Sequence, residues 1–269
     1  MDTVESKMVN LLLELKENYH ICSIKSEFEA EGATFEEVLF IKKIADNAGL
    51  DFTLKLGGCE ALRDMFDAKN IGVNAIVAPM IESVYALNKY VRTINKVFSK
   101  SEQEDIKFFI NIETKTGFDN VDEILSSKDA DKISGIVLGR TDFIGSLGLN
   151  PNDINNNKIY EYAEKLALKS LKYGKEFIIG GGVTSNSFSF FNKLMKYSLS
   201  KFETQKVIFN AEILNSDKAK EALLKAFEFE LMWIKNKEVL NGKLSEEDKN
   251  RIKILETRYN ESFLVQNVL

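Results

Sequence analysis

The sequence is poor in the residues that build disulfide frameworks and histidine sites, because its 269 residues include one histidine and two cysteines. The two cysteines, Cys22 and Cys59, are too few for a disulfide framework, and both lie in or just after predicted buried strands. The single histidine, His20, precedes the first predicted strand, and we expect a structural role for it. A reducing cytoplasmic location is therefore the expected one.

Long apolar runs and an excess of positive charge are also missing. No stretch approaches the roughly 20 apolar residues of a membrane helix. The acidic, amphipathic start MDTVESKMVNLLLELKENY differs from a signal peptide. Lysine and arginine number 36 against 41 aspartate and glutamate, giving a net charge of -5, and the two signs are interspersed along predicted helices. Because nucleic-acid binding requires a basic patch, we expect neither nucleic acid nor a membrane as partner.

What the sequence does contain is a repeated alternation of strand-like and helix-like segments over a length typical of one (β/α)8 barrel. We predict an α/β fold of the TIM (β/α)8 type with extra terminal helices. Its expected parts are an N-terminal helix at 1–19, the barrel at 20–235 and a C-terminal helical extension at 236–269. Seven strands are convincing in the sequence: 21–27, 51–56, 74–80, 108–113, 133–139, 176–180 and 207–210. The eighth is expected upstream of Ile21, unless the barrel closes irregularly.

The stretch 106–148 organises the rest of the chain, because it contains two strand-like runs that each end in an acid. In FFINIE the period of two places Phe109, Asn111 and Glu113 on one face, toward the barrel interior. The next run, 133–139, breaks into Arg140, Thr141 and Asp142. Because consecutive parallel strands usually pair, Glu113 and Asp142 are predicted to meet at the carboxyl end of the sheet.

Two carboxylates from neighbouring strands, with no histidine or cysteine nearby, suit a hard divalent cation such as Mg²⁺ or Mn²⁺. Such an ion keeps waters and takes its remaining ligands from the substrate. Two structural alternatives stay open at this point. Asp142 would then only cap the turn after its strand, and Glu113 would pair with a lysine.

These same residues resemble a known family. The pattern IET, then a VDEI segment, then GIVLGRTDF and SLG is similar to the HpcH/HpaI aldolase and citrate lyase β-subunit superfamily. The resemblance spans roughly 21–214. It implies a TIM barrel that handles a pyruvate-type or acyl substrate, with Glu113 and Asp142 as ligands of Mg²⁺ or Mn²⁺. Members often form oligomers by exchanging C-terminal helices, so a homo-oligomer is expected.

The resemblance and the alternation together suggest further site residues. Lys25 and Glu27 face the predicted interior, where they would either contact substrate or only pair with each other. Lys55 matches an arginine that contacts substrate in the family, and Asn111 matches a glutamine. We therefore expect catalytic roles for Lys25, Glu27, Lys55 and Arg140, substrate contacts from Pro79, Asn111, Gly139 and Thr141, and metal ligation by Glu113 and Asp142.

The sequence departs from the family at the general base. Many aldolases of this family carry a histidine after the first strand, and the matching position here is Phe28. The base would then be Glu27, Glu29, Glu31, a lysine or a metal-bound water. The run Gly180–Gly182 is compatible with a phosphate-binding turn, or simply with a turn that needs positive φ.

Three functional hypotheses are compatible with these residues. The first is a metal-dependent carbon–carbon lyase that acts on a 2-oxo acid and an aldehyde or acyl partner through an enolate. The second is a Schiff-base aldolase with Lys25 or Lys55 as nucleophile. The third is a catalytically inactive barrel that serves as a binding or assembly component.

Overall fold

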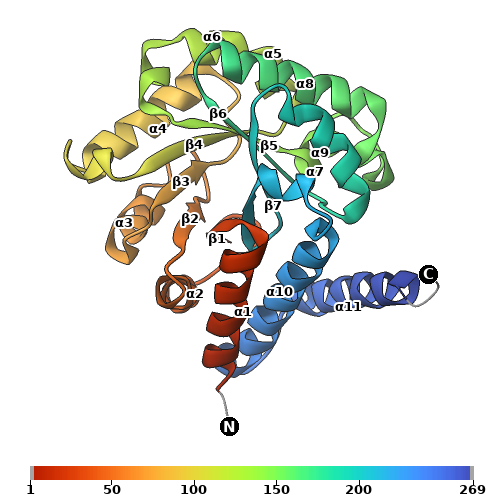
Figure 1. Cartoon of the computed structure of the whole chain (residues 1–269). Helices are drawn as coiled ribbons and strands as arrows, with labels where there is room; N and C mark the ends of the chain where they lie inside the picture. The colour runs from red at the N-terminus through yellow and green to blue at the C-terminus, as the bar shows by residue number, and fades with distance from the viewer. Residues whose placement is uncertain (1–2, 267–269) are drawn as a thin grey trace.

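Across residues 3–266, which the computed structural model describes with side chains to residue 259, eight strands close into a barrel in chain order (Figure 1). This confirms the predicted fold class. The strands are β1 (Ile21–Glu27), β2 (Asp51–Lys55), β3 (Ala75–Ala78), β4 (Lys107–Ile112), β5 (Gly135–Gly139), β6 (Glu176–Gly180), β7 (Leu199–Glu203) and β8 (Val207–Asn210).

Helices cover the outside of the barrel and alternate with the strands up to β7. The α-helices are α1 (Val4–Tyr19), α2 (Phe35–Asn47), α3 (Leu62–Ile71), α4 (Val84–Val97), α5 (Lys115–Asp119), α6 (Val121–Ser126), α7 (Arg140–Ser146), α8 (Asn157–Lys172), α9 (Phe188–Met195), α10 (Ala219–Asn241) and α11 (Glu246–Gln266). Short 3-10 helices lie at η1 (Glu102–Glu104), η2 (Lys128–Lys132), η3 (Pro151–Asn155), η4 (Ser185–Ser187) and η5 (Ala211–Asn215).

Strand β4 shows how the sequence pattern builds the two layers. Phe108, Ile110 and Ile112 are buried against the surrounding helices in the main core, whereas Phe109 packs with a small apolar cluster inside the barrel. Asn111 follows Phe109 on the inner face. The interior therefore changes from apolar to polar along the strand, as the alternation predicted, and its polar part lies at the carboxyl end.

The barrel closes irregularly, and the prediction of an eighth strand upstream of Ile21 was wrong. The missed strand is β7, which joins β8 through the short turn Thr204–Lys206 without a helix between them. As a result, β8 runs antiparallel to both β7 and β1, while the other neighbouring strands are parallel. The sequence LSKFE disguised the strand because Lys201 and Glu203 are charged, yet both line the cavities inside the barrel.

Helices α1 and α10 pack side by side against the barrel (Figure 1), and Lys225 pairs with Glu14 across them at 2.8 Å. The predicted helix end near 235 was too early, because α10 continues to Asn241 before Gly242 ends it with φ 74°. The next helix, α11, begins after Ser245, whose Oγ accepts the Asp248 N–H at 3.0 Å. The proposed boundary at 235 thus falls inside α10, and the three-part division of the chain stays a proposal.

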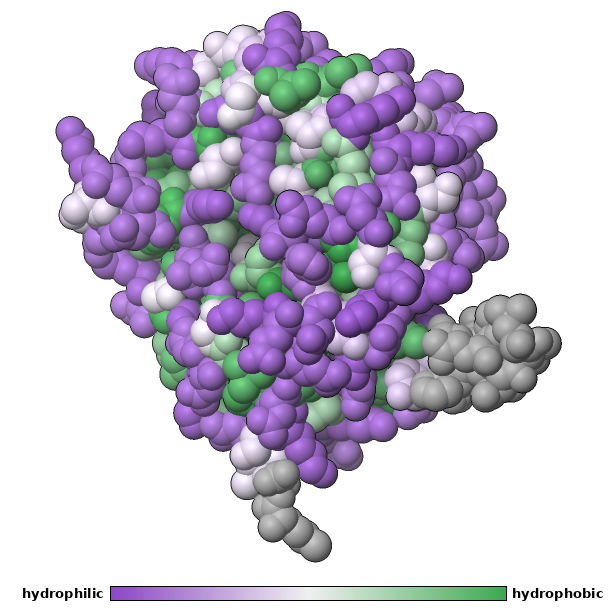
Figure 2. Space-filling view, in the orientation of Figure 1, coloured by the Kyte–Doolittle hydropathy of each residue, from purple (hydrophilic) through white to green (hydrophobic). Residues whose placement is uncertain are grey.

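The face drawn in Figure 2 is mostly hydrophilic, with apolar residues in small separate patches. Charged and polar side chains interrupt these patches, so this view shows no broad apolar area. Among the helices that the structure describes, none combines the length and hydropathy needed to cross a membrane.

Candidate functional site

A pocket of about 780 Å³ opens at the carboxyl ends of the parallel strands. It collects most of the site residues that the sequence predicted, which come from four different strands or strand ends. This is the end of a barrel at which loops and strand ends converge. The predicted residues in its lining are Lys25, Glu27, Lys55, Asn111, Glu113, Gly139, Thr141 and Asp142.

Glu113 is held firmly at the floor of the pocket and is 2% exposed. Its Oε1 accepts the Met80 N–H at 2.9 Å, and its Oε2 accepts the Asn111 amide at 2.7 Å and the Lys55 ammonium at 3.3 Å. A side chain at Gly139 would place its Cβ 2.7 Å from Glu113 Oε2. The glycine of the next strand end is therefore required for Glu113 to sit where it does.

Asp142 differs from Glu113, because its carboxylate has no hydrogen-bond partner among the residues that the structure describes. It lies in the first turn of α7 and lines the pocket. Asp142 is exposed at the pocket, but partial desolvation raises its pKa, repulsion from Glu113 and Glu27 adds to this effect, and Lys55 and Lys25 partly offset it. The positive charges around Asp142 therefore only partly balance the negative charge of its carboxylate.

The two lysines of the pocket are both held between acids. Lys25 lies 2.5 Å from Glu203 and 3.9 Å from Glu27. Burial disfavours its charged form, but these acids outweigh burial and raise the pKa of Lys25.

Lys55 pairs with Glu29 and with Glu113, and its pKa is likewise raised in spite of burial. Both lysines are therefore ammonium ions at neutral pH. Five carboxylates face these two ammonium groups at the inner end of the pocket: Glu27, Glu29, Glu113, Asp142 and Glu203.

This donor set fits a hard divalent cation. The excess negative charge around Asp142 is what a cation would relieve, and Asn111 Oδ1 is a buried acceptor with no hydrogen-bond partner. Within residues 3–266, no group of three or more acidic, histidine or cysteine side chains is placed to hold an ion. An ion here would consequently have Glu113 and Asp142 as its protein ligands and would need water or substrate for the rest.

Two predicted residues lie outside the pocket lining. Pro79 is buried at the end of β3 and does not reach the pocket. Arg140 is fully buried and points away from it, because its side chain runs under the following strand end instead of into the barrel. The sequence could not distinguish these directions, since Arg140 stands at the turn where β5 becomes α7 and the strand alternation no longer applies.

The Arg140 guanidinium supports the wall of the pocket from behind. It donates to Gly180 O at 3.1 Å, to Gly181 O at 2.7 Å and to Asn155 Oδ1 at 2.8 Å, and its carbon lies 4.7 Å from the centre of the Phe191 ring. Burial lowers the pKa of Arg140 to about 9, so it remains charged at neutral pH. It ties the glycine turn after β6 to the η3 loop.

The glycine turn that Arg140 supports forms part of the pocket wall through Gly181 and Gly182. Gly181 has φ 80°, and a Cβ there would lie 2.6 Å from the Thr141 N atom. Positive φ and close packing on the start of α7 both require glycine at this position. Phosphate binding by this turn stays a prediction.

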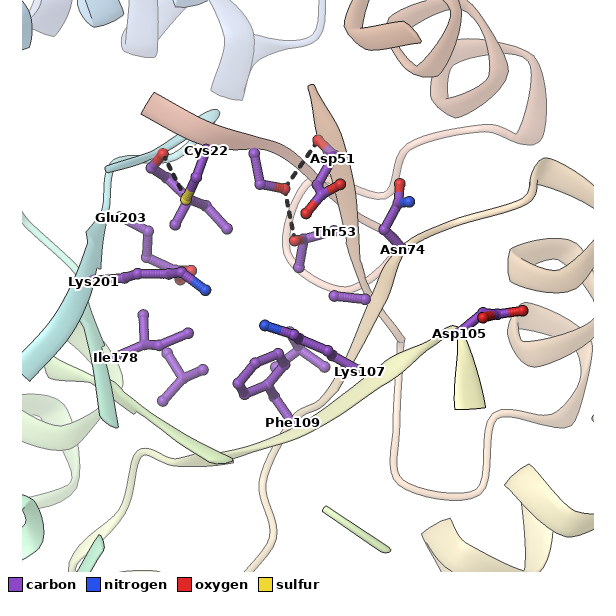
Figure 3. Close-up of a pocket in the computed structure, with 15 residues that line it drawn as sticks. Cys22, Asp51, Thr53, Asn74, Asp105, Lys107, Phe109, Ile178, Lys201 and Glu203 are labelled. Atoms are coloured by element: carbon purple, nitrogen blue, oxygen red, sulfur yellow. Dashed lines mark hydrogen bonds between the residues drawn. The ribbon is translucent and has the colours of Figure 1, made fainter. Parts of the chain in front are cut away.

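A second cavity, of about 150 Å³, lies inside the barrel at the amino ends of the strands. Figure 3 shows the ammonium groups of Lys107 and Lys201 pointing into it. Lys201 pairs with Glu176 at 2.6 Å. Burial raises the pKa of the nearby Cys22 thiol to about 11, so this sulfur is protonated at neutral pH and is a poor nucleophile.

Sequence reasoning missed the residues that later parts of the chain bring to the pocket. Glu203 was hidden with strand β7, although its alternation with Lys201 is a signal of a strand. Helices α10 and α11 add Phe227, Arg251 and Arg258, for which the sequence offers no local signal.

Comparisons with known proteins agree with this architecture. Residues 59–175 match the family model described as HpcH/HpaI aldolase/citrate lyase, and this segment contains Glu113 and Asp142. The predicted resemblance to this family is thereby confirmed over this segment. No curated protein matches the chain in sequence.

Solved structures share the fold at low sequence identity. The HpcH/HpaI aldolase from Desulfitobacterium hafniense DCB-2 is 14% identical, with a TM-score of 0.60 over 73% of this chain and 81% of that chain. A HpcH/HpaI aldolase/citrate lyase family protein from Burkholderia cenocepacia J2315 is 14% identical, with a TM-score of 0.61 over 83% and 90%. The citrate synthase SbnG is 15% identical, with a TM-score of 0.57 over 73% and 81%.

Proposed function

We propose that this chain, which carries the HpcH/HpaI aldolase/citrate lyase signature over residues 59–175, is a metal-dependent carbon–carbon lyase for a 2-oxo acid. The proposal rests mainly on one observation. Asp142 lies beside Glu113 in a pocket where the other acids have basic or amide partners, and its own carboxylate has no hydrogen-bond partner among the described residues. Acids in a cleft whose pKa is shifted by desolvation and neighbouring charges are typical of functional sites.

Glu113 and Asp142 would hold Mg²⁺ or Mn²⁺. When bound, the ion supplies positive charge that favours the enolate form of the 2-oxo acid. Asn111 orients Glu113 through its amide group and keeps Oδ1 available for a water or substrate hydroxyl. Lys55 bridges Glu113 and Glu29 and places positive charge where the substrate carboxylate would bind.

A proton must also move when the carbon–carbon bond breaks, and Glu29 is the best-placed acid for this role. It stands in the loop after β1, next to the position where many family members carry histidine, and it lines the pocket. Burial raises the pKa of Glu29, while its hydrogen bond to Lys55 opposes the rise. A carboxylate with a raised pKa is a stronger base at neutral pH than an ordinary one.

The pKa values of the two pocket lysines do not support the Schiff-base alternative. A nucleophilic lysine needs a lowered pKa so that the neutral amine is populated. The pKa values of both Lys25 and Lys55 are raised by their acidic neighbours. Borohydride added together with pyruvate is therefore expected to leave the mass of the protein unchanged.

The direct test is exchange of the C3 hydrogens of pyruvate for deuterium, measured by NMR in D2O with Mn²⁺ or Mg²⁺. Exchange is expected with the ion and is expected to stop with EDTA. Asp142→Asn is expected to lower the exchange rate about 10³-fold, because the lost charge stabilisation is on the order of 4 kcal/mol. Asp51→Asn is the matched control, since Asp51 lines the cavity at the other end of the barrel.

Three results would overturn the proposal: exchange that persists in EDTA, equal rates for Asp142→Asn and the unmodified protein, or no exchange with either ion. Binding of Mn²⁺ without any exchange would favour the inactive binding barrel instead. Circular dichroism of both variants separates loss of the site from loss of the fold. A homo-oligomer remains a separate prediction, which sedimentation would test.

A further inference from the structure

Two acids of the loop between β1 and α2 are held by different lysines. Glu29 and Glu31 both lie in this loop, where the Gly32 N–H donates to Glu29 O at 3.3 Å and closes a turn around them. Glu29 lines the pocket and pairs with Lys55. Glu31 instead turns toward the β7–β8 turn, and its side chain is 10% exposed. Because one tight turn contains both acids, the position of Glu31 constrains the position of Glu29.

The β7–β8 turn holds Glu31 through two side chains. The Gln205 amide donates to Glu31 Oε1 at 3.1 Å, and the Lys206 ammonium pairs with Glu31 Oε2. The Lys206 side chain is 2% exposed, and its ammonium lies 5.8 Å from the centre of the Trp233 ring on α10. The backbone carbonyl of Lys206 accepts the Lys25 N–H at 2.8 Å. Lys206 is therefore fixed at its backbone and along its side chain independently of Glu31.

The irregular closure of the barrel places Gln205 and Lys206 beside this loop. Strand β8 is antiparallel to its neighbours, so its first residue, Val207, lies at the carboxyl end of the parallel strands. Gln205 and Lys206 immediately precede Val207 in the chain. In a barrel with eight parallel strands, the residues before the last strand would lie at the opposite, amino end. The contact with Glu31 thus depends on the direction of β8.

A second restraint on this loop matters because Lys55 pairs with both Glu29 and Glu113 and so does not bind Glu29 alone. We propose that Glu31, held by the β7–β8 turn, is a positioning residue that keeps Glu29 beside Lys55 in the pocket. The inference rests on the proposed function, in which Glu29 moves the proton. Glu31 acts only through the backbone turn that it shares with Glu29. A misplacement of about 1 Å can lower a rate about 100-fold.

The test follows the pH dependence of pyruvate C3 hydrogen exchange in the presence of Mn²⁺ or Mg²⁺. Glu31→Gln is expected to lower the maximal rate about 10-fold, because the loop loses its charged anchor. The acidic limb of the profile is expected to move to lower pH. Burial outweighs Lys55 in raising the pKa of Glu29, and a loosened loop reduces both effects. A purely structural loss would lower the rate without moving the limb.

A second comparison determines whether Glu31 acts through Glu29. In a protein that already carries Glu29→Gln, adding Glu31→Gln is expected to change the rate by less than about twofold, because the base that it positions is gone. Two independent contributions would multiply instead. Glu176→Gln is the matched control, since Glu176 pairs with Lys201 at 2.6 Å at the other end of the barrel. It is expected to change neither the rate nor the acidic limb.

A variant without an unpaired buried charge keeps the test decisive if Glu31→Gln folds poorly. Glu31→Gln alone leaves the buried Lys206 ammonium without its carboxylate, whereas Glu31→Gln combined with Lys206→Met removes both charges. The combined variant is expected to show the same lower rate and the same shift of the acidic limb. Circular dichroism measures the fold of each variant.

The inference is overturned if Glu31→Gln leaves the rate and the acidic limb unchanged, or if its full effect persists in the Glu29→Gln protein. The pKa of Glu29 is also measured without turnover, by 13C NMR of protein labelled in its glutamate carboxyl groups. The Glu29 signal is the one missing from Glu29→Gln, and its pKa is expected to fall in Glu31→Gln. If the unmodified protein exchanges no pyruvate, the proposed function fails, and this titration still decides whether Glu31 positions Glu29.

Discussion

The two ends of this barrel each contain a charged cavity, and the charges are balanced differently. At the amino end, Lys201 pairs with Glu176 at 2.6 Å, and both side chains are about one-fifth exposed. At the carboxyl end, Glu113 is almost fully buried and Asp142 has no hydrogen-bond partner among the described residues. Glu203 lines both cavities.

We infer from this difference that the ion pair at the amino end has a structural role, whereas the acids at the carboxyl end have a chemical role. Partly exposed pairs are screened by water, and they contribute little to stability or reactivity. Asp142 is exposed, yet desolvation and repulsion from Glu113 and Glu27 raise its pKa, which a bound cation would counteract. Such an acid gains from binding a cation, and the amino-end pair does not.

The largest effect that we expect concerns two cationic side chains, Arg140 at the carboxyl end and Lys201 at the amino end. Arg140→Met is expected to lower the free energy of unfolding by about 3 kcal/mol, because the buried Gly180 and Gly181 carbonyls lose their donor. Lys201→Met, at the amino end, is expected to change it by less than about 1 kcal/mol. Urea unfolding of both variants measures the difference, and equal losses would remove the distinction between the ends.

The next effect concerns two acids with comparable exposure. Glu29→Gln is expected to lower kcat about 10²-fold, a typical contribution of a general base, whereas Glu176→Gln is expected to leave it unchanged. The raised pKa of Glu29 fixes the sign of the pH dependence. The active form is the carboxylate, so activity rises as the pH rises through this pKa, and the acidic limb of the profile is expected to disappear in Glu29→Gln.

The same shift has a consequence for folding. Folded Glu29 keeps its proton to higher pH than the unfolded chain does, so this residue's contribution to stability falls as the pH rises through its folded pKa. A Glu29→Gln protein that retains full activity with an unaltered pH profile would show that another group moves the proton.

The smallest effect concerns the amino-end cavity itself. Ala75 lines this cavity of about 150 Å³, and Ala75→Val adds two methyl groups there. If the new groups are accommodated, the free energy of unfolding rises by about 1 kcal/mol, and pyruvate exchange stays within about twofold. Thermal unfolding and the exchange assay test this together. A large loss of exchange would mean that the two cavities are coupled through Glu203.

Most of the inner site could be predicted because it depends on strand periodicity. Alternation in β4 placed Asn111 and Glu113 inside, and alternation in β1 placed Lys25 and Glu27 there. Arg140 was placed incorrectly relative to the pocket because it stands at a strand-to-helix turn, where side-chain direction depends on the turn. Strand β7 was missed because its inward residues are charged and have partners elsewhere in the chain.

The sequence by itself determined the barrel class and the two acids at neighbouring strand ends, because both follow from local periodicity and from the tendency of consecutive parallel strands to pair. Only the tertiary structure decided that β8 runs antiparallel, that Asp142 lacks a hydrogen-bond partner among the described residues, and that α11 brings Arg251 and Arg258 to the pocket. These features depend on contacts between residues far apart in the chain, and such contacts cannot be predicted from the local sequence pattern.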